Sequence, residues 1–195
     1  MRLNRIIAFD LDGTLVDSVG DIAHALNLAL AEIERGPLDV DVIRSFVGNG
    51  ARMLARRALD RVDAHVDEDA FLATFSARYE QNLMGKTVAY PGVAEMLAAL
   101  RQRDRVRIAV ATNKPGVFAR PLVEHVLAGL VGAVFGPDDV DGALKPDPAI
   151  VRRIEAALEG TVVAFVGDSG VDVQTAKSAG VSGVGVTWGL KPDEA

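Results

Sequence analysis

Short apolar runs alternate with helical spacings along most of this chain. The first run, Ile6 to Phe9, has the length of a buried strand and stops at two aspartates. Later runs predict strands, and the segments between them repeat apolar residues at helical spacing. Strands alternating with helices of this length indicate a parallel sheet with helices on both faces. The strands are expected at 106–111, 131–135, 161–166 and 183–187, and the helices at 93–102, after 115 to about 127, 149–158 and 171–179.

A helical stretch interrupts this pattern directly after the first strand. Apolar residues recur at helical spacing from Val16 to about Arg35, where Gly36-Pro37 is expected to end the helix. No strand pattern occurs between Val16 and Met84, and Asn49 is placed as a possible helix N-cap. The prediction is an α/β fold with a Rossmann-like parallel sheet, residues 1–15 and 86–195, and a small all-helical domain inserted at 16–85. The further helices are expected at 40–46, 51–59 and 68–83.

Composition narrows the class of protein. With 195 residues, 49% of them hydrophobic, the chain can build one good-sized core, or a core domain and a small accessory one. A net charge of −6 and no basic block argue against nucleic acid as a partner. The absence of cysteine excludes disulfides and thiolate chemistry. Because Asp10 breaks the N-terminal apolar run, we expect no signal peptide, no membrane partner and a cytoplasmic location. The sequence does not indicate an oligomeric state.

The polar candidates follow predicted strands. Asp10 and Asp12 point to the same side of an extended chain, and two ionised carboxylates about 4 Å apart repel by about 4 kcal/mol at an effective dielectric near 20. Each candidate alone is also compatible with a turn residue, a strand-end cap or a solvated charge. Together at one sheet edge they suggest a phosphate and a hard cation such as Mg²⁺. The set is Asp10, Asp12, Thr112, Lys145 and Asp168.

Four motifs carry a family resemblance. RIIAFDLDGTLVDS begins at Arg5, VATNKP contains Thr112, KPDP begins at Lys145, and VGDSGVD contains Asp168 and Asp172. In this order they resemble the signature motifs of the haloacid dehalogenase superfamily, most of whose members are phosphatases with an aspartate nucleophile.

The resemblance implies a role for each matching residue. Asp10 is expected to attack phosphorus and form an aspartyl-phosphate, and Asp12 to act as the general acid and base. Asp172 either reaches the metal or orients the groups around it. The expected Mg²⁺ ligands are Asp10, the backbone carbonyl of Asp12 and Asp168, and the expected phosphoryl-binding groups are Thr112, the amide of Asn113 and Lys145.

The same resemblance bears on the reaction. The acid at Asp12 argues against dehalogenases and phosphonate hydrolases, whereas sugar phosphomutases keep it, so a β-phosphoglucomutase-like enzyme stays as an alternative. A non-catalytic protein that binds a phosphorylated metabolite is another, although such a protein needs no acid at Asp12. The position of the helical insertion resembles that of a cap domain that closes over the site.

More closely, the chain resembles phosphoglycolate phosphatases, through FDLDGTLVDS, VGNGA, YPGV and GVTWG as well as the other motifs. This implies hydrolysis of 2-phosphoglycolate, a small phosphorylated metabolite, to glycolate and inorganic phosphate. Gly48 and Asn49 would then lie on the cap surface facing the site. Arg52 is either a ligand for a second charged end of the substrate or a solvated helix residue.

Overall fold

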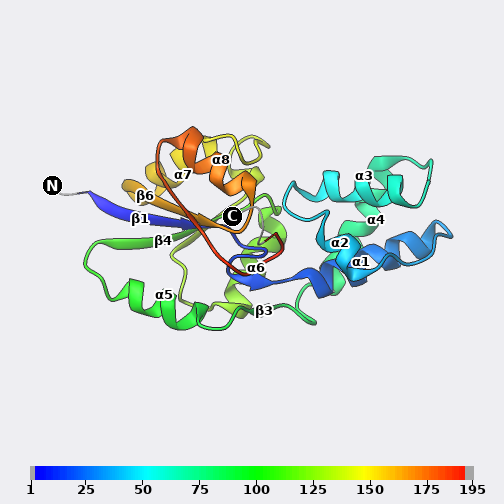
Figure 1. Ribbon diagram of the computed structural model, residues 1–195, viewed down its shortest axis with the longest axis horizontal. Coiled ribbons are helices and arrows are strands. Elements are labelled where there is room, and N and C mark those ends of the chain that lie inside the picture. Colours follow the sequence, from blue (N-terminus) through cyan, green and yellow to red (C-terminus); the bar gives the residue numbers. More distant parts are fainter. Residues whose placement is uncertain (1–2, 192–195) are drawn as a thin grey trace.

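The computed structural model describes residues 3–191, and within them the core is a parallel sheet (Figure 1). Its strand order, β5-β4-β1-β6-β7, places the first strand in the middle, and each neighbouring pair is parallel. The parallel α/β fold predicted from the sequence is therefore confirmed. The strands are β1 (Asn4–Phe9), β4 (Val106–Ala111), β5 (Ala133–Phe135), β6 (Gly160–Gly167) and β7 (Ser182–Gly185).

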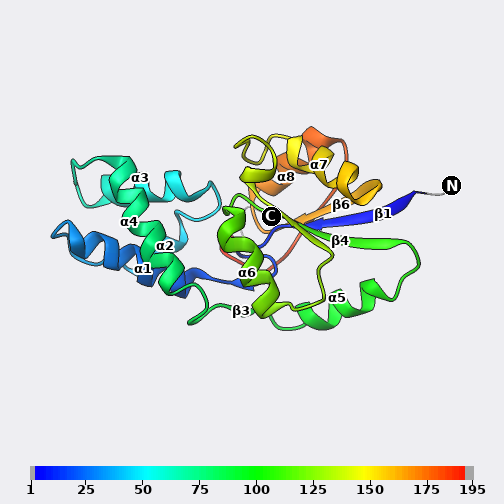
Figure 2. The ribbon, with the colours of Figure 1, turned by 180° about the vertical axis from the view of Figure 1, so that it is seen from behind.

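Helices cover both faces of this sheet. Figures 1 and 2 show α5 and α6 on one side, and α7 and α8 on the other. A short 3-10 helix, η1 (Pro137–Asp139), follows β5. Within residues 3–191, no helix is both long and apolar enough to cross a membrane. The helices are α5 (Val93–Arg101), α6 (Gly116–Val126), α7 (Ala149–Leu158) and α8 (Gly170–Ala179).

Alternation along β1 explains this two-sided burial. Successive side chains of a strand point to opposite faces. Phe9 belongs to the apolar cluster that includes Leu97 of α5, whereas Ala8 belongs to the cluster that includes Ile154 of α7. Because both faces bury apolar side chains, the strand appears in the sequence as a continuous apolar run.

The segment predicted to be an inserted domain is helical and lies beside the carboxyl end of β1 (Figure 1). Its helices contribute to the same apolar cluster as Phe9, in which Leu26 of α1 and Phe75 of α4 are buried. Asp67 caps α4 by accepting a hydrogen bond from the backbone N–H of Ala70, at 2.7 Å. That this helical segment forms a separate domain stays a prediction. The helices are α1 (Val19–Glu32), α2 (Val40–Arg44), α3 (Ala51–Arg61) and α4 (Glu68–Gln81).

Two sequence predictions in this segment are wrong. The residues before α1 form a short strand, β2 (Val16–Asp17), which pairs antiparallel with β3 (Val88–Ala89). A ladder of two residues is too short to leave an alternating pattern, and its partner lies far away in the sequence. Asn49 is not the N-cap of α3, because Gly50 takes that position with φ of 84°, a conformation that favours glycine.

Candidate active site

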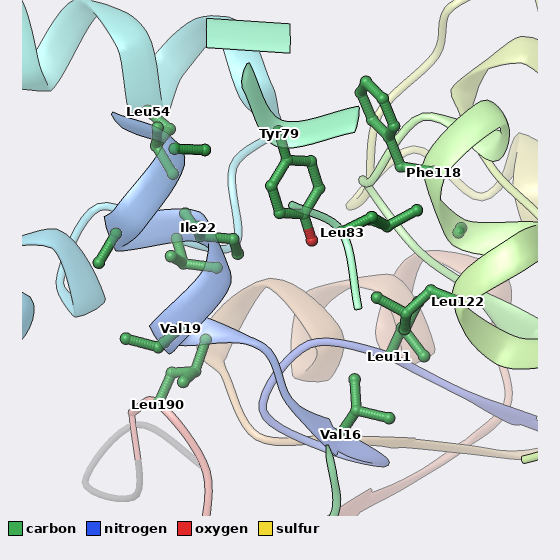
Figure 3. Close-up of a cluster of buried hydrophobic side chains, with 14 of the residues drawn as sticks. Leu11, Val16, Val19, Ile22, Leu54, Tyr79, Leu83, Phe118, Leu122 and Leu190 are labelled. Atoms are coloured by element: carbon green, nitrogen blue, oxygen red, sulfur yellow. The ribbon is translucent and has the colours of Figure 1, made fainter. Parts of the chain in front are cut away.

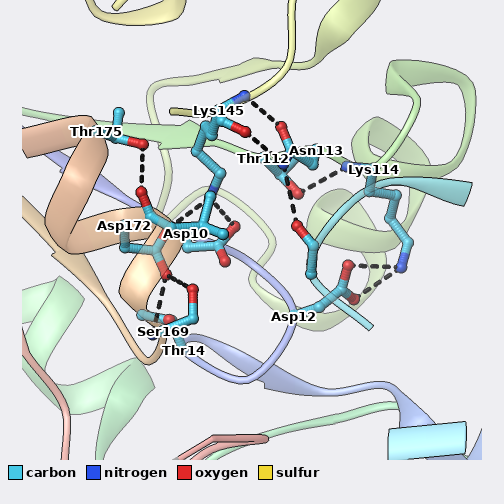
Figure 4. Close-up of polar contacts among 12 residues, drawn as sticks. Asp10, Asp12, Thr14, Thr112, Asn113, Lys114, Lys145, Ser169, Asp172 and Thr175 are labelled. Atoms are coloured by element: carbon cyan, nitrogen blue, oxygen red, sulfur yellow. Dashed lines mark hydrogen bonds and ion pairs between the residues drawn. The ribbon is translucent and has the colours of Figure 1, made fainter. Parts of the chain in front are cut away.

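Asp10 lies at the carboxyl end of the central strand. Its backbone N–H donates to the carbonyl of Val166 in β6 at 2.8 Å, so the neighbouring strand fixes the start of the loop. The ammonium of Lys145 lies 2.8 Å from Oδ1 of Asp10 and 2.7 Å from Oδ1 of Asp172 (Figure 4). Lys145 comes from the long loop between η1 and α7, well beyond the end of β5. The Lys145 ammonium thus bridges Asp10 and Asp172, which are far apart in the sequence.

Three carboxylates meet here. Asp10, Asp168 and Asp172 each offer an oxygen, and these oxygens all lie within 4.8 Å of one another. Asp168 accepts hydrogen bonds from the backbone N–H of Leu190 at 2.8 Å and from the hydroxyl of Thr14 at 3.3 Å. Three buried acids facing one lysine leave an excess of negative charge. Oxygen ligands with this charge fit a hard divalent cation such as Mg²⁺.

Two glycines make room for Asp168. A Cβ at Gly13 would lie 2.3 Å from Oδ2 of Asp168, and one at Gly189 would lie 2.7 Å from its Cβ. Both glycines have positive φ, 90° and 106°. Backbone turns without side chains therefore allow the Asp168 carboxylate to sit against the Asp10 loop.

Burial changes the ionisation of this group of acids. Removal from water raises the pKa of Asp10 to about 8, against the opposing charge of Lys145, and the carboxylates of Asp172 and Asp168 also raise it. Burial likewise raises the pKa of Asp168. A divalent cation among these oxygens would favour the ionised forms. Asp10 would then be ionised, and the ionised form of a carboxylate is the one that can act as a nucleophile.

The carboxylate of Asp12 makes a different set of contacts. Both of its oxygens accept from the ammonium of Lys114, at 2.7 and 2.9 Å, and Oδ1 also accepts from the hydroxyl of Ser18 (Figure 4). Burial acts to lower the pKa of Lys114, but the charge of Asp12 outweighs it and raises the pKa. Sequence reasoning missed Lys114, although it stands inside the VATNKP motif, because lysines in loops are usually exposed.

Asn113 links the site to the helical insertion. Its side-chain N–H groups donate to the backbone carbonyls of Gly48, at 3.0 Å, and Lys145, at 3.3 Å, while its Oδ1 accepts from the backbone N–H of Lys145 at 2.7 Å. The hydroxyl of Thr112 accepts from the backbone N–H of Lys114 at 3.0 Å. Thr112 and Asn113 line the same cavity as Asp10 and Asp12.

The cavity lies between the sheet edge and the helical insertion. Its polar side is formed by residues that follow β1 and β4, and its other side is apolar (Figure 3). Gly48 lines it, but Asn49 and Arg52 do not. The guanidinium of Arg52 instead pairs with Glu68 at 3.1 Å and Asp69 at 2.7 Å. The apolar lining includes Ile22, Val47, Ala51, Leu54, Phe75, Tyr79 and Phe118.

Comparisons with known proteins show which family the chain is similar to. A family model described as haloacid dehalogenase-like hydrolase matches residues 5–180. A phosphoglycolate phosphatase from Pseudomonas putida is 42% identical over 195 residues, which cover 96% of this chain and 71% of that protein. Phosphoglycolate phosphatase 1 of Pseudomonas aeruginosa is 40% identical with the same coverage. The crystal structure of a predicted phosphoglycolate phosphatase from Haemophilus somnus superposes with a TM-score of 0.89 at 32% identity, covering 99% of this chain and 89% of that one.

Proposed function

We propose that this chain, which belongs to the haloacid dehalogenase-like hydrolases and is a phosphoric monoester hydrolase, hydrolyses 2-phosphoglycolate to glycolate and inorganic phosphate with Mg²⁺. The observation that carries the proposal is the position of Asp10, which faces the cavity, lies 2.8 Å from the Lys145 ammonium and shares a group of three acids. The substrate is suggested by the relatives at about 40% identity that are named phosphoglycolate phosphatases.

The residues around the cavity suggest two steps. In the first, a carboxylate oxygen of Asp10 bonds to phosphorus, the bond to the glycolate oxygen breaks, and Asp12 gives that oxygen a proton. In the second, Asp12 takes a proton from water, whose oxygen attacks phosphorus and releases phosphate and free Asp10. Lys145 would neutralise charge on the phosphoryl oxygens, and Thr112 and the amide of Asn113 would hold them.

The acids also fit the proposed cation. Asp10 and Asp168 would hold Mg²⁺ together with the backbone carbonyl of Asp12, and the bound ion would polarise the phosphoryl group. Asp172 uses one oxygen for Lys145, at 2.7 Å, and the other for the backbone N–H and hydroxyl of Ser169, at 3.1 and 2.6 Å. Because both oxygens are engaged, we propose that Asp172 positions Lys145.

The test is phosphate release from 2-phosphoglycolate and from β-glucose 1-phosphate, each with Mg²⁺ and with a chelator. We expect magnesium-dependent phosphate release from 2-phosphoglycolate, and none from the Asp10→Asn variant, which should keep its circular dichroism spectrum. Formation of glucose 6-phosphate from glucose 1-phosphate would favour a phosphomutase instead. Folded protein with no turnover of either ester would favour a binding protein.

A further inference from the structure

The cavity beside the nucleophile has an uneven distribution of charge. Of the described residues that line it, Lys114 is the one with a cationic side chain, since Lys145 does not line it. The side chain of Lys114 is only 6% exposed. Arg52, the cation expected from the sequence to meet a second charged end of the substrate, pairs with Glu68 and Asp69 instead. A second anionic group in the cavity would therefore meet Lys114.

Tyr79 of α4 adds a second donor on the same side of the cavity. Its ring lies under Lys114, with the ammonium 5.0 Å from the ring centroid. Tyr79 is 2% exposed and lines the cavity, and its hydroxyl lies next to the Lys114 ammonium, but its own O–H finds no acceptor among residues 3–191. Figure 3 shows this hydroxyl pointing away from α4, toward the space between Ile22 and Leu83. A buried O–H without an acceptor costs free energy, so its presence on a cavity wall points to a missing acceptor.

Tyr79 is held in place by its neighbours. Its ring stacks on Phe75 with centroids 5.9 Å apart, and it meets Phe118 of α6 edge to face at 5.3 Å. The phenol is thus fixed between the helical insertion and the core. Burial raises its pKa, against the opposing charge of Lys114, so the hydroxyl keeps its proton and can donate.

The Lys114 ammonium interacts with Tyr79 as well as with Asp12, and both partners raise its pKa. An ammonium carries three N–H bonds, and its described hydrogen bonds go to the two oxygens of Asp12. We infer that Lys114 and Tyr79 form a subsite for a carboxylate of the substrate, so that the cavity selects phosphate monoesters of short hydroxy acids. This inference rests on the proposed function and extends it from the phosphate to the other end of the substrate.

The place of this subsite fits a short substrate. Lys114 is hydrogen-bonded to Asp12, the residue proposed to give its proton to the ester oxygen. A carboxylate one carbon away from that oxygen would lie next to the Lys114 ammonium, as in 2-phosphoglycolate. The rest of the lining is mostly apolar, so a longer polar chain would find few partners there.

The experiment compares 2-phosphoglycolate with 2-hydroxyethyl phosphate, which has a neutral hydroxymethyl group where the former has the carboxylate. The readout is the ratio of kcat/KM for the two esters in Mg²⁺. In Lys114→Met the ratio should fall about ten- to hundred-fold, the usual range for a lost hydrogen bond to a charged group. In Tyr79→Phe, which removes only the hydroxyl and its unused O–H donor, the ratio should fall by several-fold, mainly through KM. The exposed Lys177→Met serves as the matched control and should keep the ratio of the original protein.

The outcomes distinguish a Lys114 that binds the substrate carboxylate from a Lys114 that only positions Asp12. If Lys114 only positions Asp12, Lys114→Met slows both esters equally, the ratio stays constant, and the subsite is refuted. A protein that hydrolyses both esters equally well also refutes it, while leaving the phosphatase intact. Absence of turnover of any ester refutes the proposed function and the subsite together. Should Lys114→Met not fold, Tyr79→Phe alone decides, since an unchanged ratio there contradicts a shared carboxylate site.

Discussion

The carboxylate of Asp21 accepts hydrogen bonds from both the backbone N–H and the hydroxyl of Thr87, at 2.8 and 2.7 Å. These bonds join the start of α1 to the segment that leads from the helical insertion back to the sheet. The same oxygen accepts from the backbone N–H of Lys86 at 2.9 Å, and Asp21 is 2% exposed. This contact closes the base of the helical insertion next to the β2–β3 ladder. It holds together the two chain segments that connect the helical insertion to the sheet.

Replacing Asp21 by alanine should therefore destabilise the protein. Two buried donors of Thr87 and a partly buried one of Lys86 would lose their acceptor, and we expect a loss of about 3 kcal/mol in the free energy of unfolding, measured with urea. Asp104→Ala is the control, because the Asp104 side chain is 93% exposed, and it should change stability by less than about 0.5 kcal/mol. Equal stability of the two variants would mean that Asp21 does not hold the insertion.

Gly13→Ala should disturb the acids proposed to bind Mg²⁺. A Cβ at Gly13 would overlap with the Asp168 carboxylate, so that Asp168 must move. Displacement of a positioned group by about 1 Å can cost about a hundred-fold in rate, and we expect a fall of that order in kcat.

Gly142→Ala is the matched control for this change. Gly142 has a similar φ, 81°, but a Cβ there would meet nothing within 4 Å. It should lose about 1 kcal/mol of stability from the left-handed backbone and keep its kcat. If both variants keep full activity, the close approach of Gly13 to Asp168 has no functional role.

Lys145→Met should destabilise the metal-free protein more than the magnesium-bound one. The Lys145 side chain is 1% exposed, and its loss would leave Asp10 and Asp172 without their cation. Breaking one side of a buried ion pair costs about 3 to 5 kcal/mol. Added Mg²⁺ would restore positive charge next to Asp10, so the loss measured in urea should shrink with the ion present. A loss of the same size with and without Mg²⁺ would place the ion elsewhere.

Magnesium should stabilise the protein more at pH 8 than at pH 6. The pKa of Asp10 is raised from 3.8 to about 8 in the folded, metal-free protein. Because the unfolded chain releases this proton first, the metal-free protein loses stability as the pH rises from about 4 to about 8. Mg²⁺ must displace the same proton, so its binding becomes tighter over that range.

The expected difference between the two pH values is about 2 kcal/mol of added stability at saturating Mg²⁺. Urea unfolding at each pH, with Mg²⁺ and with a chelator, measures it. Asp10→Asn has no group to titrate at this position and should show a smaller pH dependence, with the raised pKa of Asp168 as the part that stays. An equal effect of Mg²⁺ at both pH values would count against Asp10 as a ligand.

Much of the fold was predictable from local patterns. Strands such as Asn4–Phe9 are buried on both faces and therefore appear as apolar runs, and α7 and α8 carry helical spacing between such runs. The β2–β3 ladder was not predictable, because two residues carry no period. The N-cap at Gly50 depends on a backbone conformation that the sequence does not show.

For the site, the sequence determined which residue types follow the strands, since the motifs place acids and a hydroxyl at strand ends, whereas Lys145, also expected at a strand end, stands in the loop before α7. Only the tertiary structure decided how they pair. It directed Lys145 to Asp10 and Asp172, turned Asp12 toward Lys114, and drew Arg52 away to Glu68 and Asp69. The physical reason is that burial and pairing depend on which elements pack together, and a lysine in a loop has the same local sequence whether it is solvated or enclosed.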